Sequence, residues 1–141
     1  MTLVVIDDNP GDLRLIREAV ARADPSMDVI SFTDGPEAID ALCGSHATIQ
    51  PGAILLDLRL GAADGLDVLR IIRFVPRLAD IPVIVFTSSN AAADRHRSHL
   101  LGATRFLRKP LEAEDYFRAV DDVVQQIRRG PESKRGRGSE E

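Results

Sequence analysis

Side chains suited to metal or phosphoryl chemistry stand at the ends of four short runs of this sequence. Asp7 and Asp8 follow LVVI, Asp57 follows AILL, Thr87 follows VIVF, and Lys109 follows RFLR. Adjacent carboxylates raise each other's pKa unless a positive charge lies close by. A hard divalent cation such as Mg²⁺ supplies that charge, because carboxylates are among the ligands that it prefers. A carboxylate beside such a cation can also act as a nucleophile toward a phosphoryl group.

These residues must be brought together by the elements between them, and the hydrophobic pattern predicts which elements those are. Short apolar or mixed runs alternate five times with amphipathic segments of helical period. We expect strands at 3–6, 28–33, 53–56, 82–86 and 104–108, and helices at 10–23, 36–43, 65–75, 91–101 and 112–129. Asn9 is the expected cap of the first of these helices and Asn90 of the fourth.

Strict alternation of strands and helices predicts an α/β fold in which right-handed crossovers cover both faces of a parallel sheet. The fully apolar runs LVVI, AILL and VIVF belong in the centre of that sheet, and the more polar ISFT and RFLR suit its edges. A flavodoxin-like, doubly wound sheet of five strands in the order 2-1-3-4-5, with five helices, satisfies this ranking. The sequence alone leaves other strand orders open.

Ligands of open parallel sheets bind outside the carboxyl ends of the strands, where the strand order reverses. The acidic, hydroxyl and amine residues named above all follow strand ends, so they are expected to gather on one rim. There Asp8 is the expected direct ligand of Mg²⁺, with Asp7 binding directly or through water. Taken alone, this pair is equally compatible with capping of the first helix, because carboxylates are favourable at a helix N-terminus.

Composition limits the classes of protein to which the chain can belong. Its 141 residues, 44% of them hydrophobic, suit one domain, expected at 1–129, with a disordered tail at 130–141. No apolar run approaches the roughly 20 residues needed to cross a bilayer, and a net charge of −4 argues against a general nucleic-acid binder. No secretory signal is recognisable and Cys43 is the single cysteine, so we expect a cytoplasmic protein.

Four separated motifs carry a family resemblance. The segments IDDNPGD, LLDLRLGAADG, VIVFTSS and GATRFLRKP together resemble the response regulator receiver domain of two-component signalling, over about residues 2 to 129. The resemblance implies a signalling domain rather than an enzyme, with Mg²⁺ as cofactor. It also assigns roles: Asp57 as phosphoacceptor, Asp7 and Asp8 as the acidic pair at the metal, Arg59 as the backbone carbonyl that completes the metal site, Thr87 and Phe106 as switch residues, and Lys109 as the conserved-type lysine before a cis Pro110.

The same resemblance implies a phosphorylation-driven switch. A sensor histidine kinase phosphorylates Asp57, Thr87 moves to bond a phosphoryl oxygen, and Phe106 turns into the vacated space. The opening DNPGDLRLIREA resembles small regulators paired with phytochrome-type kinases. With no output domain in the sequence, output is expected through the surface of the fourth helix, fifth strand and fifth helix, by homodimerisation or by docking onto a partner protein.

Rival functions lack their motifs. Small Mg²⁺-dependent aspartyl phosphatases of the haloacid-dehalogenase type carry the motif DxDx[TV] after their first strand. The segment IDDNPG at this place does not match that motif. Neither GxxxxGK[ST] nor GxGxxG follows a strand, which argues against a nucleotide site. A receiver-like interaction module that is never phosphorylated stays an alternative, although it gives no reason for three crowded acids. His46, His96 and His99 lie outside the strand ends and are interpreted as surface residues.

Arg59 lies two residues after Asp57 and carries a long basic side chain. The resemblance implies that Arg59 flanks the phosphoryl face, where side chains of the family influence how water reaches the aspartyl phosphate. We therefore expect Arg59 to alter the lifetime of the phosphorylated state. Phe106 has no hydroxyl, so apolar burial alone would favour its inward position.

Overall fold

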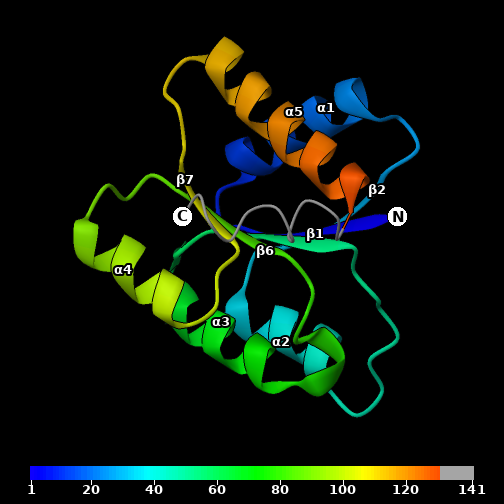
Figure 1. The fold of residues 1–141 in the computed structure, drawn as a ribbon, viewed down its shortest axis with the longest axis vertical. Coiled ribbons are helices and arrows are strands. Elements are labelled where there is room, and N and C mark those ends of the chain that lie inside the picture. Colours follow the sequence, from blue (N-terminus) through cyan, green and yellow to red (C-terminus); the bar gives the residue numbers. More distant parts are fainter. Residues whose placement is uncertain (131–141) are drawn as a thin grey trace.

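Alternating strands and helices build one parallel sheet between two helical layers (Figure 1). A computed structural model describes residues 1–130. The strands are β1 (Thr2–Ile6), β2 (Asp28–Phe32), β3 (Ala53–Leu56), β4 (Arg59–Leu60), β5 (Ala63–Asp64), β6 (Val83–Thr87) and β7 (Arg105–Arg108). The helices are α1 (Pro10–Ala23), α2 (Gly35–Cys43), α3 (Gly65–Phe74), α4 (Ala92–Leu100) and α5 (Ala113–Arg129), with a 3₁₀ turn η1 (Pro76–Leu78).

The main sheet has the order β2-β1-β3-β6-β7, and all its neighbouring strands are parallel. In terms of its five strands alone this is the predicted order 2-1-3-4-5, with the apolar runs in the centre and the polar ones at the edges. Helices α1 and α5 cover one face of the sheet, and α2, α3 and α4 cover the other (Figure 1). The flavodoxin-like fold is thereby confirmed.

Each central strand sends alternate side chains into two separate cores, which is why its sequence is apolar throughout. Leu3 and Val5 of β1 lie in the cluster under α1 and α5. Val4 and Ile6 lie in the cluster under α2 and α3. Val124 of α5 is fully buried in the first cluster. Two packed faces hold the strand register firmly, because a slip of one residue would exchange the two sets of side chains.

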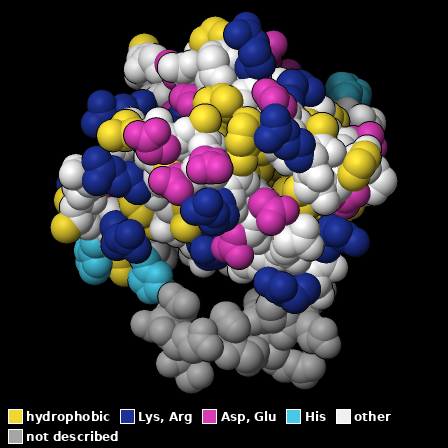
Figure 2. Space-filling view, turned by 90° about the horizontal axis from the view of Figure 1, so that it is seen from above, with side chains coloured by type: hydrophobic (Ala, Val, Ile, Leu, Met, Phe, Trp, Pro, Cys, Tyr) yellow, Lys and Arg dark blue, Asp and Glu magenta, His cyan; other side chains and the backbone are white. Residues whose placement is uncertain are grey.

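The outer surface of the α1 and α5 layer carries acidic and basic side chains side by side (Figure 2). One ion pair lies within each helix, Arg22 with Glu18 at 2.9 Å and Arg118 with Asp115 at 2.9 Å. Both pairs are well exposed, so each contributes little to stability. This surface suits a solvated face rather than a large apolar interface.

Helix ends follow the sequence signals in most places. The Asn9 side chain accepts a hydrogen bond from the Asp12 backbone N–H, and Pro10 opens α1, as predicted. The prediction that Asn90 caps the fourth helix is wrong, since α4 begins after Ala91 without a side-chain cap. Instead the Ser89 hydroxyl accepts from the Ala91 N–H at 3.3 Å and donates to Asp94 at 2.6 Å. The buried Ser89 hydroxyl thus bonds the N–H of Ala91, the residue before α4, and Ser89 lies one residue earlier than the predicted cap.

A short hairpin was not predicted. The two-residue strands β4 and β5 pair in antiparallel fashion directly after Asp57. Gly61 opens their turn with a φ of 64°, a backbone conformation that glycine adopts without a side-chain clash. The Leu58 carbonyl then accepts a hydrogen bond from the Gly65 N–H at the start of α3, at 2.9 Å. The loop after Asp57 is therefore folded back against its own base. The predicted disordered tail, apart from Gly130, lies outside the described residues.

Candidate functional site

The strand ends meet on one rim, and backbone hydrogen bonds continue the sheet up to the residues that stand there. The Asp7 N–H donates to the Phe32 carbonyl at 3.0 Å, and the Asp57 N–H donates to the Ile6 carbonyl at 2.9 Å. On the other side of the rim, the Lys109 N–H donates to the Thr87 carbonyl at 2.7 Å. Each main chain is thus fixed by its neighbour strand, so the side chains converge without depending on loops.

Lys109 is the centre of this cluster. Its Nζ donates to Asp7 Oδ2 at 2.7 Å, to Asp57 Oδ2 at 2.9 Å and to Asp12 Oδ2 at 2.9 Å. The lysine side chain is only 8% exposed. Burial alone would lower the pKa of Lys109, but the hydrogen bonds that the ammonium donates to the three carboxylates outweigh burial, and its pKa lies above the usual range. The ammonium therefore stays charged at any physiological pH.

The pKa of Asp7 is also raised, which for a carboxylic acid favours the neutral form. Its side chain is 2% exposed, and burial raises its pKa to about 6, against the lowering effect of the hydrogen bonds from Lys109 and from the Asn9 N–H. The nearby charge of Asp57 raises the pKa further. A single ammonium does not fully compensate this group of acids, and a divalent cation would complete the compensation.

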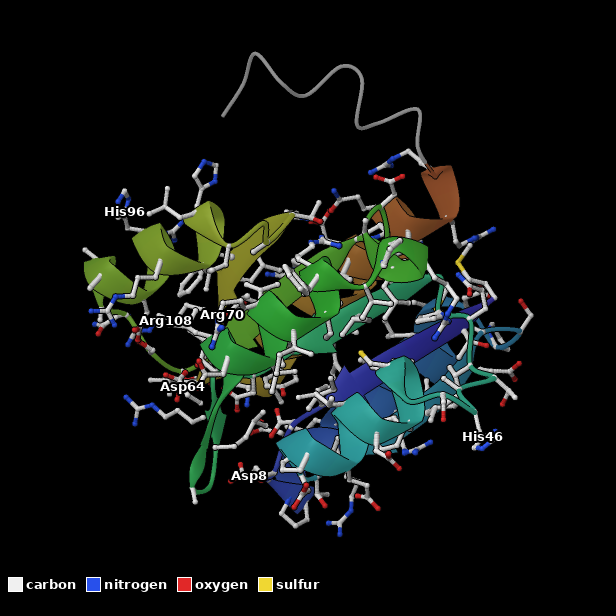
Figure 3. All side chains as sticks on the ribbon, turned by 90° about the horizontal axis from the view of Figure 1, so that it is seen from below. Asp8, His46, Asp64, Arg70, His96 and Arg108 are labelled. Carbon is white, nitrogen blue, oxygen red and sulfur yellow. The ribbon has the colours of Figure 1, made fainter. Side chains whose placement is uncertain are left out.

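The acidic cluster fits a hard divalent cation. Asp7, Asp8 and Asp57 each offer a carboxylate oxygen, and these oxygens lie within 4.8 Å of one another. Oxygens on opposite sides of Mg²⁺ stand roughly 4.2 Å apart, so small side-chain rotations suffice to close the set around an ion. Asp8 is exposed and lies at the open edge of the molecule (Figure 3). It offers the site an entry from solvent, while Asp7 and Asp57 supply a buried floor.

The predicted accessory residues are Arg59, Thr87 and Phe106, and the structure shows the contacts of each. The Arg59 N–H donates to Asp57 Oδ1 at 3.1 Å, and the Arg59 side chain is exposed. Thr87 is fully buried at the end of β6, and its hydroxyl oxygen accepts from the Ser89 N–H at 3.3 Å. Phe106 on β7 is half-buried beneath the guanidinium of Arg95, whose carbon lies 4.9 Å from the ring centroid. The ring also packs against the small core cluster of Leu58, Leu66 and Val85.

The Lys109–Pro110 peptide bond is trans, and the expectation of a cis bond, which came from the family resemblance, is wrong. Trans is the intrinsically favoured isomer before proline. Here the sheet hydrogen bond from the Lys109 N–H and the three carboxylates direct the lysine into the site. The trans peptide bond is therefore compatible with this orientation of the Lys109 side chain.

Sequence reasoning missed two members of the site. Asp12 looked like an ordinary acidic residue in the first turn of a helix, and Tyr116 like a core residue of α5. In the structure the Tyr116 hydroxyl donates to Asp12 Oδ1 at 2.9 Å, while Lys109 occupies the other carboxylate oxygen. Burial first, and then the hydrogen bond to Asp12, raise the pKa of Tyr116. The available signal was the position of Asp12 one turn after the acidic pair, on the side of α1 that faces the sheet end.

The three histidines are exposed, as predicted, and the two that Figure 3 labels, His46 and His96, lie far from Asp8. Within residues 1–130, no helix combines the length and apolar character that crossing a bilayer requires. The arrangement of acids, amine and hydroxyl can bind a divalent cation and place a carboxylate oxygen beside two donors for an incoming anion. That is the constellation needed to accept a phosphoryl group on a carboxylate.

Comparison with known proteins gives concordant matches. The family model of the response regulator receiver domain matches residues 3–121. The chain is 34% identical over 124 residues to the probable methanogenesis regulatory protein FilR2 of Methanothrix harundinacea, which covers 86% of this chain and 79% of that protein. It is 32% identical over 124 residues to the response regulator Rcp1 of a Synechocystis strain, which covers 86% of this chain and 84% of that protein.

Solved structures resemble the chain over similar lengths. The Mn²⁺-bound form of the response regulator Rcp1 superposes with a TM-score of 0.80 at 30% identity, covering 88% of this chain and 91% of that one. The phosphorylated cyanobacterial phytochrome response regulator RcpA superposes with a TM-score of 0.81 at 32% identity, again over 88% and 91%. One of these similar structures thus holds a divalent cation, and the other is phosphorylated.

Proposed function

The chain belongs to the response regulator receiver domain family, and from this premise we propose that it is a two-component phosphoacceptor, switched by phosphorylation of Asp57. One observation carries the proposal: Lys109 Nζ lies 2.9 Å from Asp57 Oδ2 in a buried group of acids that a divalent cation would complete. A surface aspartate in an idle domain would need neither the buried amine nor the neighbouring carboxylates.

In the proposed reaction, an Asp57 carboxylate oxygen attacks the phosphorus of a phosphohistidine on a sensor histidine kinase. The new bond joins that oxygen to phosphorus, the P–N bond breaks, and its electron pair returns to the imidazole nitrogen, which is protonated from solvent. The product is an aspartyl phosphate. Lys109 binds a phosphoryl oxygen as a compact positive charge, and Thr87 offers a hydroxyl donor at the same rim.

We propose Mg²⁺ as the cofactor, held by carboxylates of Asp7, Asp8 and Asp57 and by the backbone carbonyl of Arg59. Its chemistry would be to neutralise the charge of the acids and of the incoming phosphoryl group. The hydrogen bond from the Arg59 N–H to Asp57 keeps Arg59 beside the acceptor, which supports this assignment. The Mn²⁺-bound form of Rcp1 supports a divalent cation in the family fold, and Mg²⁺ is the choice for this chain because its site offers only oxygen ligands.

The proposed switch involves Thr87 and Phe106. Once Asp57 carries the phosphoryl group, the Thr87 hydroxyl leaves its contact with the Ser89 N–H and bonds a phosphoryl oxygen. Phe106 then leaves the Arg95 guanidinium and turns into the space that Thr87 vacates. The charge added at Asp57 thereby shifts the equilibrium between two conformations of the surface made by α4, β7 and α5.

The partners follow from this chemistry. We propose a sensor histidine kinase as phosphoryl donor, and the phytochrome response regulator among the similar structures favours a phytochrome-type kinase. Output would pass through the α4, β7 and α5 surface, by homodimerisation or by docking onto another protein, without contact to nucleic acid or membrane. We place the reaction in the cytoplasm, where the lone Cys43 stays reduced.

Phosphorylation by a small acyl phosphate tests the proposal without knowledge of the kinase. The protein is incubated with acetyl phosphate and Mg²⁺, and its intact mass is measured. We expect one added phosphoryl group, absent in Asp57→Asn and absent when EDTA removes the metal. An unmodified wild-type protein, with a folded state confirmed by circular dichroism, would support the alternative of an interaction module that is never phosphorylated. Continuous release of phosphate from varied phosphate esters would favour a phosphatase.

A further inference from the structure

The side chain of Asp12 is held from two other parts of the fold. Lys109 Nζ, after β7, donates to Asp12 Oδ2 at 2.9 Å, and the Tyr116 hydroxyl, on α5, donates to Asp12 Oδ1 at 2.9 Å. The carboxylate is 20% exposed, and the tyrosine is buried at 3% exposure. Tyr116, Asp12 and Lys109 therefore form a hydrogen-bonded chain that ends on the oxygen of Asp57.

Ordinary helix capping does not account for this orientation of Asp12. Asp12 is the third residue of α1, where an acidic side chain commonly turns back to the N–H of the capping residue. Here the Asn9 N–H already donates to Asp7 Oδ1 at 2.9 Å. The Asn9 side chain in turn accepts from the Asp12 N–H at 3.1 Å. The N–H groups of Asn9 and Asp12 are thus bonded without the Asp12 carboxylate, which binds Lys109 and Tyr116 instead.

Tyr116 is itself fixed by packing. Its ring meets the ring of Phe86 edge to face, with centroids 5.1 Å apart and an interplanar angle of 70°. Phe86 precedes Thr87 on β6, so the tyrosine stands directly behind the rim. Since burial raises its pKa, the Tyr116 hydroxyl keeps its proton and acts as a donor. A rigid ring with one donor aimed at Asp12 is a suitable fixed end for the chain of hydrogen bonds.

We propose that Asp12 and Tyr116 are positioning residues for phosphoryl transfer, which hold the Lys109 ammonium beside the Asp57 carboxylate. The proposal rests on the phosphoacceptor function given above. Of the three carboxylates that bind Lys109, Asp7 and Asp57 belong to the acidic cluster suited to the metal, and Asp12 does not. When the cation and the phosphoryl group engage the other two, Asp12 is the partner that remains to orient the lysine.

A purely structural role would have different consequences. The contacts also join α1 to the β7–α5 connection and to α5, so they could serve only to fasten the helices to each other. In that case the loss of either side chain lowers the free energy of unfolding but leaves the folded protein's phosphorylation rate unchanged. A positioning role predicts a slower reaction at saturating phosphodonor and Mg²⁺, together with interdependence of the two residues.

The test measures the rate of phosphorylation by acetyl phosphate against phosphodonor concentration, at saturating Mg²⁺, for Asp12→Ala, Tyr116→Phe and the double variant. We expect the maximal rate of Asp12→Ala to fall about tenfold, the lower end of what loss of an outer-shell partner costs. Tyr116→Phe keeps the packing on Phe86 and should fall less. The KM for acetyl phosphate should stay within about twofold, because neither residue contacts the donor. Glu18→Ala, an exposed acid on the same helix, is the control and should match the wild type.

The double variant gives the sharper readout. If Tyr116 acts through Asp12, the double variant should be no slower than Asp12→Ala alone. Rates are compared at a temperature where denaturation curves show every variant to be folded. The positioning role would be overturned if Asp12→Ala had the wild-type maximal rate. It would also be overturned if Tyr116→Phe slowed the Asp12→Ala protein as much as it slows the wild type. Either result would leave the phosphoacceptor function intact. A wild-type protein that accepts no phosphoryl group would overturn both.

Discussion

Removal of the Lys109 ammonium should destabilise the metal-free protein in a strongly pH-dependent manner. Three ion-paired hydrogen bonds of 2.7 to 2.9 Å end on this nitrogen, and its side chain is 8% exposed. Charge-assisted hydrogen bonds contribute about 1.5 to 3 kcal/mol each, and desolvation of the ammonium offsets part of the sum. Lys109→Met leaves three carboxylates without their cation, so we expect a loss of about 3 to 5 kcal/mol at pH 7.5.

At pH 5 the loss should be smaller. Burial raises the pKa of Asp7 to about 6, so this acid is largely neutral at pH 5 and its repulsion with Asp57 is relieved. Urea denaturation in EDTA at the two pH values measures both free energies of unfolding. Arg108→Met, an exposed neighbour on β7, is the control and should change stability by less than about 0.5 kcal/mol. Equal losses at pH 5 and pH 7.5, or no loss at all, would refute the view that Lys109 neutralises a buried group of acids.

Further predictions concern the metal, the phosphoryl lifetime and the switch. Because Asp7 must lose its proton to bind a cation, Mg²⁺ affinity measured by calorimetry should be full at pH 7.5 and fall as the pH drops through about 6; Asp7→Asn should bind weakly with little such pH dependence. Arg59→Ala should change the rate at which the phosphoprotein loses its phosphoryl group, followed by intact mass, and an unchanged rate would eliminate that role. Arg95→Ala removes a cation–π contact of about 0.5 to 1 kcal/mol, so fluorine NMR of labelled phenylalanine should detect a two- to fivefold larger ratio of the inward to the outward conformation of Phe106; identical spectra would contradict the proposal that Arg95 holds the ring in place.

Much of the fold is contained in the hydrophobic pattern. Fully apolar runs such as Ala53–Leu56 have only one stable place, the centre of a sheet with both faces covered, and this ranks the strands. The strand order then selects the rim where Asp57 and Lys109 meet. Both inferences need only the types of residue and the alternation of elements, which is why they could be made without coordinates.

What the sequence did not reveal depends on side-chain competition and on very short elements. Asp12 resembles any acid in a first helical turn, and only the occupation of the Asn9 N–H by Asp7 shows that its carboxylate is free for Lys109. Tyr116 has the spacing of a core residue, and its hydroxyl bond depends on how α1 and α5 pack. The hairpin at Arg59–Leu60 and Ala63–Asp64 is shorter than any periodicity can detect. Asn90 has the residue type of a cap, but α4 begins after Ala91 without a side-chain cap, and the buried Ser89 hydroxyl accepts from the Ala91 N–H instead.

The central claim is that the gathered acids and Lys109 make one carboxylate, that of Asp57, the acceptor of a phosphoryl group. Reduction of the acyl phosphate with borohydride, followed by peptide mass mapping, tests it most directly, because it converts the phosphorylated aspartate to homoserine at its position in the chain. After treatment with acetyl phosphate and Mg²⁺, we predict homoserine at residue 57 and at no other acid of the rim. Homoserine at Asp7, Asp8 or Asp12, or a stable phosphoryl group on a histidine, would contradict the account.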